Sequence, residues 1–239
     1  MRRLPDGSWT YSPKDLIAWL EGDFAAWCER EAAEHRGTGG SGAPPREPDA
    51  RDDEMELAVR YGLEHEQQHL DRLRQLHPTL TEIDPKAPNA AAVTREALRR
   101  GAPVVFQAVL ESGRWMGIAD FLHRVEHASG LGDWAYEPWD TKLARSAKPY
   151  FLLQLCAYAE MLEATQALRP DRLGFILGDG SESHFRTDDF WHYYRRLKEQ
   201  FERFQAAWDP QAMPDPGADR GHGRWTAPPV PRSHPPRGM

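Results

Sequence analysis

Hydrophobic and polar positions alternate in the middle of the chain. From Arg114 to Glu126 the sequence reads RWMGIADFLHRVE, where aromatic and aliphatic residues recur with a period of two. That period is typical of a strand. Strand-like runs also cover residues 104–111 and 134–144, and Ser112-Gly113 predicts a tight turn between the first two strands. We therefore predict three consecutive strands that form an antiparallel meander.

Other segments show a period near 3.6, which predicts helices. The expected helices cover residues 9–33, 54–76, 87–100, 149–166 and 187–208. A fourth strand is expected at residues 171–178; because a helix leads into it, it should pair in parallel with a neighbouring strand. The predicted fold class is α/β, with a mixed central sheet flanked by helices.

Composition sets the domain organisation. The chain has 239 residues and 40% hydrophobic content, enough for one sizeable domain, which we place at residues 8–208. Residues 36–53 are rich in Gly, Pro and charge without periodicity, and are expected to form a flexible insertion. Residues 209–239 contain 8 prolines and 4 glycines among 31 residues, which predicts a disordered tail.

Charge and cysteine content restrict the cellular compartment and the kinds of partner. The net charge of −7 argues against a general nucleic-acid coat protein, although a metal ion can neutralise an acidic pocket. No apolar run is long enough to span a membrane, and residues 1–3 are not followed by the apolar region of a signal peptide. The two cysteines suggest no disulfide framework. These features predict a cytoplasmic protein without a membrane partner.

Five polar residues in the central stretch carry candidate chemistry. Asp120 and Asp140 lie on neighbouring predicted strands and could converge on one hard divalent cation. Lys142 follows Asp140 by two residues, so both side chains should share a face. Gln154 and Tyr158 are separated by four residues on a helix and should also share a face. Any one of these pairs is common at protein surfaces; their combination favours a site.

These residues carry a resemblance to a known family. The segments Gly117-Ile-Ala-Asp120, Trp139-Asp140-Thr-Lys142 and Gln154-Leu-Cys-Ala-Tyr158 resemble motifs II, III and QxxxY of RecB-type nucleases in the PD-(D/E)XK superfamily. The similarity extends from about residue 9 to 204 and includes RecB-like nucleases fused to helicases and CRISPR-adaptation nucleases. It implies a restriction-endonuclease-like core and a DNA nuclease of repair, recombination or defence.

The resemblance also implies roles for individual residues. Mg²⁺ or Mn²⁺ would be held by Asp120, Asp140, an upstream histidine matched here by His65, and the Thr141 carbonyl. Lys142 would act on the attacking water. Gln154 and Tyr158 would engage the DNA, single-stranded or at duplex ends. A helicase or another repair or defence protein is the implied partner.

Basic and cysteine residues refine the expectation. Arg145 and Lys148 follow the Asp140 strand and could bind the phosphate backbone. The iron–sulfur cysteines of related nucleases are missing, and two cysteines cannot supply four thiolates. We therefore expect no iron–sulfur cluster.

Two alternatives remain open from the sequence. His65-Glu66-Gln67-Gln68-His69 fits H-E-x-x-H, the pattern of a zinc-binding helix, but no third ligand stands out. We expect His65 to act as a single ligand and His69 to lie at the surface. The second alternative is a non-catalytic nucleic-acid-binding or interaction module that keeps the nuclease fold.

Overall fold

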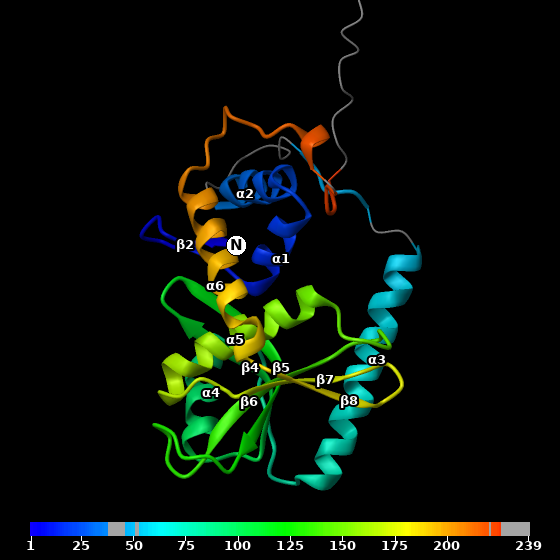
Figure 1. The fold of residues 1–239 in the computed structure, drawn as a ribbon, viewed down its shortest axis with the longest axis vertical. Coiled ribbons are helices and arrows are strands. Elements are labelled where there is room, and N and C mark those ends of the chain that lie inside the picture. The colour runs from blue at the N-terminus through cyan, green and yellow to red at the C-terminus, as the bar shows by residue number, and fades with distance from the viewer. Residues whose placement is uncertain (38–45, 51–52, 220, 226–239) are drawn as a thin grey trace, which may run out of the picture.

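The computed structural model describes residues 1–37, 46–50, 53–219 and 221–225. It is an α/β protein whose central sheet lies between helices (Figure 1). The helices are α1 (Pro13–Glu21), α2 (Asp23–Gly37), α3 (Asp53–Leu76), α4 (Ala90–Arg99), α5 (Pro149–Gln166) and α6 (Asp188–Ala206). The strands of the central sheet are β3 (Thr81–Glu82), β4 (Val104–Ser112), β5 (Trp115–Val125), β6 (Ala135–Thr141), β7 (Arg172–Ile176) and β8 (Glu182–Arg186).

The sheet has the order β3-β4-β5-β6-β7-β8. β4, β5 and β6 form an antiparallel meander, and β7 pairs in parallel with β6. Both predictions from the sequence are confirmed. Two edge strands were not predicted: β3 pairs in parallel with β4, and β8 pairs antiparallel with β7. Each is at most five residues long, too short for a clear periodic signal.

The pairing of β4 with β5 is interrupted at one position. Phe106 pairs with Phe121 and Ala108 pairs with Ala119, so Gln107 lies opposite Asp120 without a regular pair. Gln107 has φ of 54°, in the left-handed region. On either side of this position the strands change face: Ala119 belongs to the main core, whereas Phe121 belongs to a smaller core on the other face. The strict alternation expected from residue 115 to 123 is therefore wrong at Asp120.

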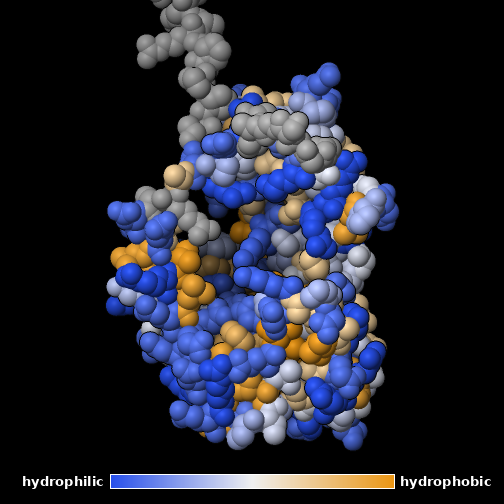
Figure 2. Space-filling model, turned by 180° about the vertical axis from the view of Figure 1, so that it is seen from behind, coloured by the Kyte–Doolittle hydropathy of each residue, from blue (hydrophilic) through white to orange (hydrophobic). Residues whose placement is uncertain are grey.

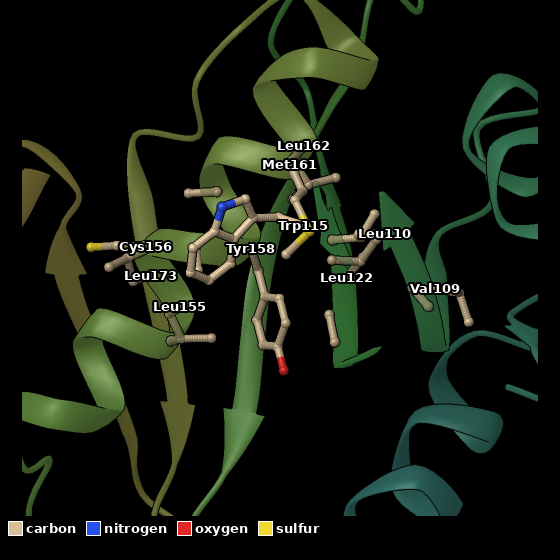
Figure 3. Close-up of a cluster of buried hydrophobic side chains, with 14 of the residues drawn as sticks. Val109, Leu110, Trp115, Leu122, Leu155, Cys156, Tyr158, Met161, Leu162 and Leu173 are labelled. Atoms are coloured by element: carbon tan, nitrogen blue, oxygen red, sulfur yellow. The ribbon is translucent and has the colours of Figure 1, made fainter. Parts of the chain in front are cut away.

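Helix α5 covers one face of the sheet and supplies much of the main core. Figure 3 shows its side chains, including Tyr158, Met161 and Leu162, beside Trp115 and Leu122 of β5. Gly117 allows this close approach, because a Cβ there would lie 2.7 Å from the Tyr158 ring. A larger residue at position 117 would push α5 away from β5.

Helix α3 lies against the opposite face. Its C-terminal half contributes Leu70 and Leu73 to the smaller core, with Phe121, Trp139 and Ile176 of the sheet. Its N-terminal half is exposed and carries apolar side chains such as Met55 and Leu63. The space-filling view shows hydrophobic side chains on this side of the molecule and a hollow between them and the body (Figure 2).

Helices α1, α2 and α6 stack beyond α5 (Figure 1). The sequence predicted one helix over residues 9–33, and this is wrong: residues 9–10 form β2, which pairs with β1 (Arg2–Arg3), and Gly22 separates α1 from α2. Only glycine fits at position 22, because a Cβ there would overlap the carboxyl group of Asp219. At the start of α1, the Ser12 amide donates to Asp15 Oδ2 at 2.7 Å and Pro13 takes the first helical position, as expected.

The segment after α6 contacts α2 where the structure describes it. Asp219 accepts a hydrogen bond from the Phe24 amide at 2.7 Å, and Trp225 is buried with Phe24 and Trp27 of α2. The structure thus describes contacts to α2 from residues 219 and 225 of the predicted tail, and the disorder of this tail stays a prediction. The rest of the predicted tail, 226–239, and residues 38–45 and 51–52 of the predicted insertion lie outside the described residues. Within the described part of the chain, no helix combines the length and apolarity needed to cross a membrane.

Candidate functional site

A pocket of about 520 Å³ opens where β4, β5 and β6 meet the flank of α3 and the start of α5. We call it the acidic pocket. It is lined by Lys14, Val59, Gly62, Leu63, Glu66, Gln107, Ile118, Asp120, Thr141, Lys142, Gln154 and Tyr158. Asp120, Thr141, Lys142, Gln154 and Tyr158 were expected from the sequence to form one site, and the fold brings them together.

Asp140 and Lys142 form the base of this site. The Lys142 Nζ atom lies 2.5 Å from Asp140 Oδ2, which confirms that the two side chains share a face. The Asp140 side chain is 1% exposed. Apart from this ion pair, neither carboxylate oxygen accepts a hydrogen bond from another residue that the structure describes. A buried carboxylate with free lone pairs is costly unless something binds it.

Asp120 lies beside Asp140, on the neighbouring strand. Burial raises the pKa of Asp120 well above its usual value, and the negative charge of Asp140 raises it further. The Lys142 ammonium opposes this increase, but only in part. Two carboxylates in such proximity repel each other when both are ionised, so a cation between them would lower the free energy of the site.

Helix α3 contributes Glu66 to the acidic pocket. The Gln107 side-chain amide donates a hydrogen bond to Glu66 Oε1 at 2.6 Å. Burial raises the pKa of Glu66; the hydrogen bond from Gln107 lowers it in part, and the charge of Asp140 adds to the increase. Gln107, at the interrupted position of β4, therefore also holds Glu66 of α3 in the acidic pocket near Asp120.

Gln154 and Tyr158 reach the pocket from α5. The Gln154 Nε2 atom donates to the Tyr158 hydroxyl oxygen at 3.1 Å, so the expected common face is confirmed. Figure 3 shows the Tyr158 ring among apolar side chains, with its hydroxyl oxygen pointing away from them. Burial raises the pKa of Tyr158, which keeps the phenol protonated and able to donate a hydrogen bond.

His65, the expected histidine ligand, lines a different pocket. Its Nε2 atom lies 3.3 Å from the Ile176 carbonyl oxygen, and with His69 it borders a polar cavity of about 200 Å³ beside the β7–β8 turn. Its role as a ligand stays a prediction; the structure places the adjacent Glu66 in the acidic pocket instead. One residue along a helix turns the side chain by about 100°, which explains why the two face different pockets.

His69 is buried rather than at the surface, so this expectation is wrong. Its side chain packs edge-on against Phe121, with ring centroids 5.0 Å apart. Burial lowers its pKa to about 4, with a further contribution from Arg72 and His65. Among the described residues, no group of three or more His, Cys, Asp or Glu side chains could hold a metal ion, which does not support the zinc interpretation of H-E-x-x-H.

Of the basic residues near the site, only some line the acidic pocket. Arg145 and Lys148 are exposed on the segment between β6 and α5, and neither lines the acidic pocket. Lys14 does line it, from the first turn of α1, and was not singled out from the sequence. No local pattern marks Lys14, because its position depends on the packing of α1 against α5.

The side chains fit a hard divalent cation. Asp120 and Asp140 supply carboxylate oxygens, and apart from the ion pair with Lys142 neither Asp140 oxygen accepts a hydrogen bond from a described residue. Thr141 lies between Asp140 and Lys142 at the same strand end. Mg²⁺ is typically held by one or two protein carboxylates and completes its shell with water and substrate phosphate oxygens. Two carboxylates without a third ligand match that arrangement better than a closed zinc site.

Comparison with known proteins adds no family. No protein-family model matches the chain, and no curated protein matches it with significance.

Proposed function

We propose that the protein is a metal-dependent deoxyribonuclease that hydrolyses phosphodiester bonds, with a restriction-endonuclease-like core. The observation that carries the proposal is that Asp120 and Lys142 line one pocket and both interact with the buried Asp140: its charge raises the pKa of Asp120, and Lys142 Nζ lies 2.5 Å from Asp140 Oδ2. Four polar residues of the RecB-like motifs, from β5, the end of β6 and α5, line this cavity: Asp120, Lys142, Gln154 and Tyr158. The fifth, Asp140, pairs with Lys142.

In this proposal Asp120, Asp140 and the Thr141 carbonyl hold Mg²⁺ or Mn²⁺. When bound there, the cation would supply Lewis acidity at a phosphoryl oxygen and charge stabilisation in the transition state. Lys142 keeps an ammonium group beside Asp140, where it can orient the attacking water or balance charge on the phosphoryl oxygens. Gln154 and Tyr158 offer an amide and a protonated phenol to the strand that enters the pocket.

The walls of the pocket suit a nucleotide. Val59 and Leu63 of α3 and Ile118 of β5 are exposed apolar side chains that border the same cavity as the carboxylates. They could contact sugars and bases while the polar floor contacts the phosphate. Lys14 places a cation at the rim despite the net charge of −7, and Arg145 and Lys148 could bind the backbone further out.

The test is cleavage of labelled single-stranded and duplex DNA with Mg²⁺, with Mn²⁺ and with a chelator. Wild type should cleave only with a metal ion. Asp140→Asn should lose metal binding and cleavage, since it removes one of two ligand charges. Lys142→Ala should bind DNA but cleave about 10²–10³ more slowly, the usual effect of removing one positioned electrostatic group.

Lys86→Ala is the matched control, because Lys86 is an exposed lysine before α4 and lines none of the pockets described above. Circular dichroism should establish that each variant is folded. If wild type and Lys142→Ala bind DNA equally and neither cleaves with any metal ion, the protein is a non-catalytic nucleic-acid-binding module.

A further inference from the structure

A second pocket, of about 330 Å³, adjoins the acidic pocket. We call it the aromatic pocket. It is lined by Lys14, Ile17, Ala18, Glu21, Ala25, Glu29, Tyr150, Phe151, Gln154, Gly223, Arg224 and Trp225. Its walls come from α1, α2, the first turn of α5 and the segment around Trp225, which are distant in sequence. Only the folded chain assembles it.

The two pockets are neighbours. Lys14 and Gln154 line both of them. Phe151 provides a further link, because the Lys142 Nζ atom lies 5.0 Å from the centroid of its ring. The same ammonium group is 2.5 Å from Asp140. A strand with a phosphate at the acidic pocket could therefore extend a neighbouring group toward the aromatic pocket.

The chemistry of the aromatic pocket favours a flat, uncharged ring over a phosphate. Tyr150 and Phe151 meet edge to face with ring centroids 4.5 Å apart, and Tyr150 is 40% exposed, so its ring can contact a ligand. Ile17, Ala18 and Ala25 add aliphatic surface. The two carboxylates, Glu21 and Glu29, would repel a phosphate but can accept hydrogen bonds from the amino groups of a base.

The charge of Glu29 is already balanced in part. Arg224 forms an ion pair with it at 2.5 Å, and the Trp225 indole donates to it at 3.1 Å. This arrangement holds the segment before residue 226 against α2 and completes the wall of the pocket. Lys14 lines the pocket and Lys148 lies 5.9 Å from the centroid of the Tyr150 ring, so both cations could contact phosphates that flank a bound base.

We propose that the aromatic pocket is a subsite for one unpaired nucleobase, adjacent to the phosphodiester held at the acidic pocket. This inference rests on the proposed function, because it takes a nucleic-acid strand as the ligand of the acidic pocket. A base can enter such a pocket only if it is not paired, so the protein should prefer single strands or frayed ends. Stacking on an aromatic side chain tolerates any base, so little sequence preference follows.

The probe is a series of short single-stranded DNA oligonucleotides, each with an abasic site at a different position. Binding is measured by fluorescence anisotropy with Ca²⁺ in place of Mg²⁺, to limit cleavage. One position in the series should bind wild type about 10-fold more weakly than the intact strand, the usual effect of one lost stacking contact. 2-Aminopurine at that position should lose fluorescence on binding.

Two variants locate the effect in the aromatic pocket. Tyr150→Ala removes the exposed ring, and Ala18→Trp fills the space from α1. Both should bind the intact strand about 10-fold more weakly and should no longer distinguish the abasic oligonucleotide from the intact one. Tyr193→Ala is the matched control, because Tyr193 is an exposed tyrosine on α6 that lines neither pocket, and it should behave as wild type.

The outcomes separate the subsite from the nuclease. Cleavage of DNA without any position-specific abasic effect would overturn the subsite and leave the nuclease proposal standing. A position-specific effect that disappears in Tyr150→Ala, without cleavage by wild type, would support the subsite and reject the nuclease. No binding of any oligonucleotide would overturn the subsite outright.

Discussion

Gln107 lies opposite Asp120 where the pairing of β4 with β5 is interrupted, and both side chains enter the acidic pocket. Gln107 adopts φ of 54° there, a conformation that costs a non-glycine residue of order 1–3 kcal/mol. Its side chain also donates to Glu66 at 2.6 Å. The strained position thus places the Gln107 side chain in the pocket beside Asp120, where it binds Glu66.

Substitutions at Gln107 should separate strain from function. Gln107→Gly should change the free energy of unfolding by no more than about 1 kcal/mol, since relief of the left-handed φ offsets the lost hydrogen bond. It should lower the cleavage rate, because Glu66 loses its partner. Gln107→Val should be less stable than Gln107→Gly by more than about 1 kcal/mol, because a β-branched residue is unfavourable at positive φ. Chemical denaturation measures both; equal stabilities would contradict the strained backbone.

Asp120 should limit stability in the metal-free protein. A carboxyl group whose pKa is raised on folding stabilises the fold below its unfolded pKa, and this contribution is lost as pH rises through the folded pKa. At neutral pH, Asp120→Asn removes the repulsion with Asp140 and should raise the melting temperature of metal-free protein. Mg²⁺ or Mn²⁺ should raise the melting temperature of wild type but have little effect on the variant. A wild type insensitive to both ions would argue against the metal site.

Glu66 and His65 offer a direct comparison on α3. Glu66→Gln should reduce cleavage at limiting Mn²⁺ by at least about 10-fold, because it removes a negative charge that attracts the cation. His65→Ala should have a smaller effect, since its ring borders the cavity beside the β7–β8 turn. Cleavage rates across a Mn²⁺ titration distinguish the two. The reverse ranking would favour His65 as the ligand that the family resemblance implies.

The buried histidines predict sensitivity to acid. Burial lowers the pKa of His69 to about 4 and that of His123 to about 3, and neighbouring positive groups add to both shifts. In the unfolded chain these groups titrate near 6.5, so their contribution is full above that pH and is lost as pH falls toward 4 and 3. Unfolding free energies between pH 7.5 and 4 should therefore decrease steeply.

His69→Phe should flatten this pH dependence, because it replaces a ring that packs against Phe121 with one that cannot be protonated. His192→Phe, at an exposed position of α6, serves as its control. If the two variants show the same slope as wild type, His69 does not set the acid sensitivity.

Local sequence determined most of the elements of the fold. Alternation predicted the meander, and its parallel neighbour followed from the intervening helix, because these patterns arise from burial of one face of each element. The two-residue spacing of Asp140 and Lys142 and the four-residue spacing of Gln154 and Tyr158 fixed shared faces for the same reason. These relations depend only on the repeat of a strand or a helix.

Tertiary structure decided what local repeats do not contain. Gln107 is not a glycine, so nothing in the sequence marked its left-handed φ or the change of face between Ala119 and Phe121. Glu66 faces the carboxylates while His65 faces the β7–β8 turn because of how α3 rotates against the sheet, and Lys14 joins them through helix packing. Trp225 packs against aromatic residues of α2, although the composition around it is typical of disorder. Each depends on contacts between residues far apart in the sequence, whose free energy no local pattern records.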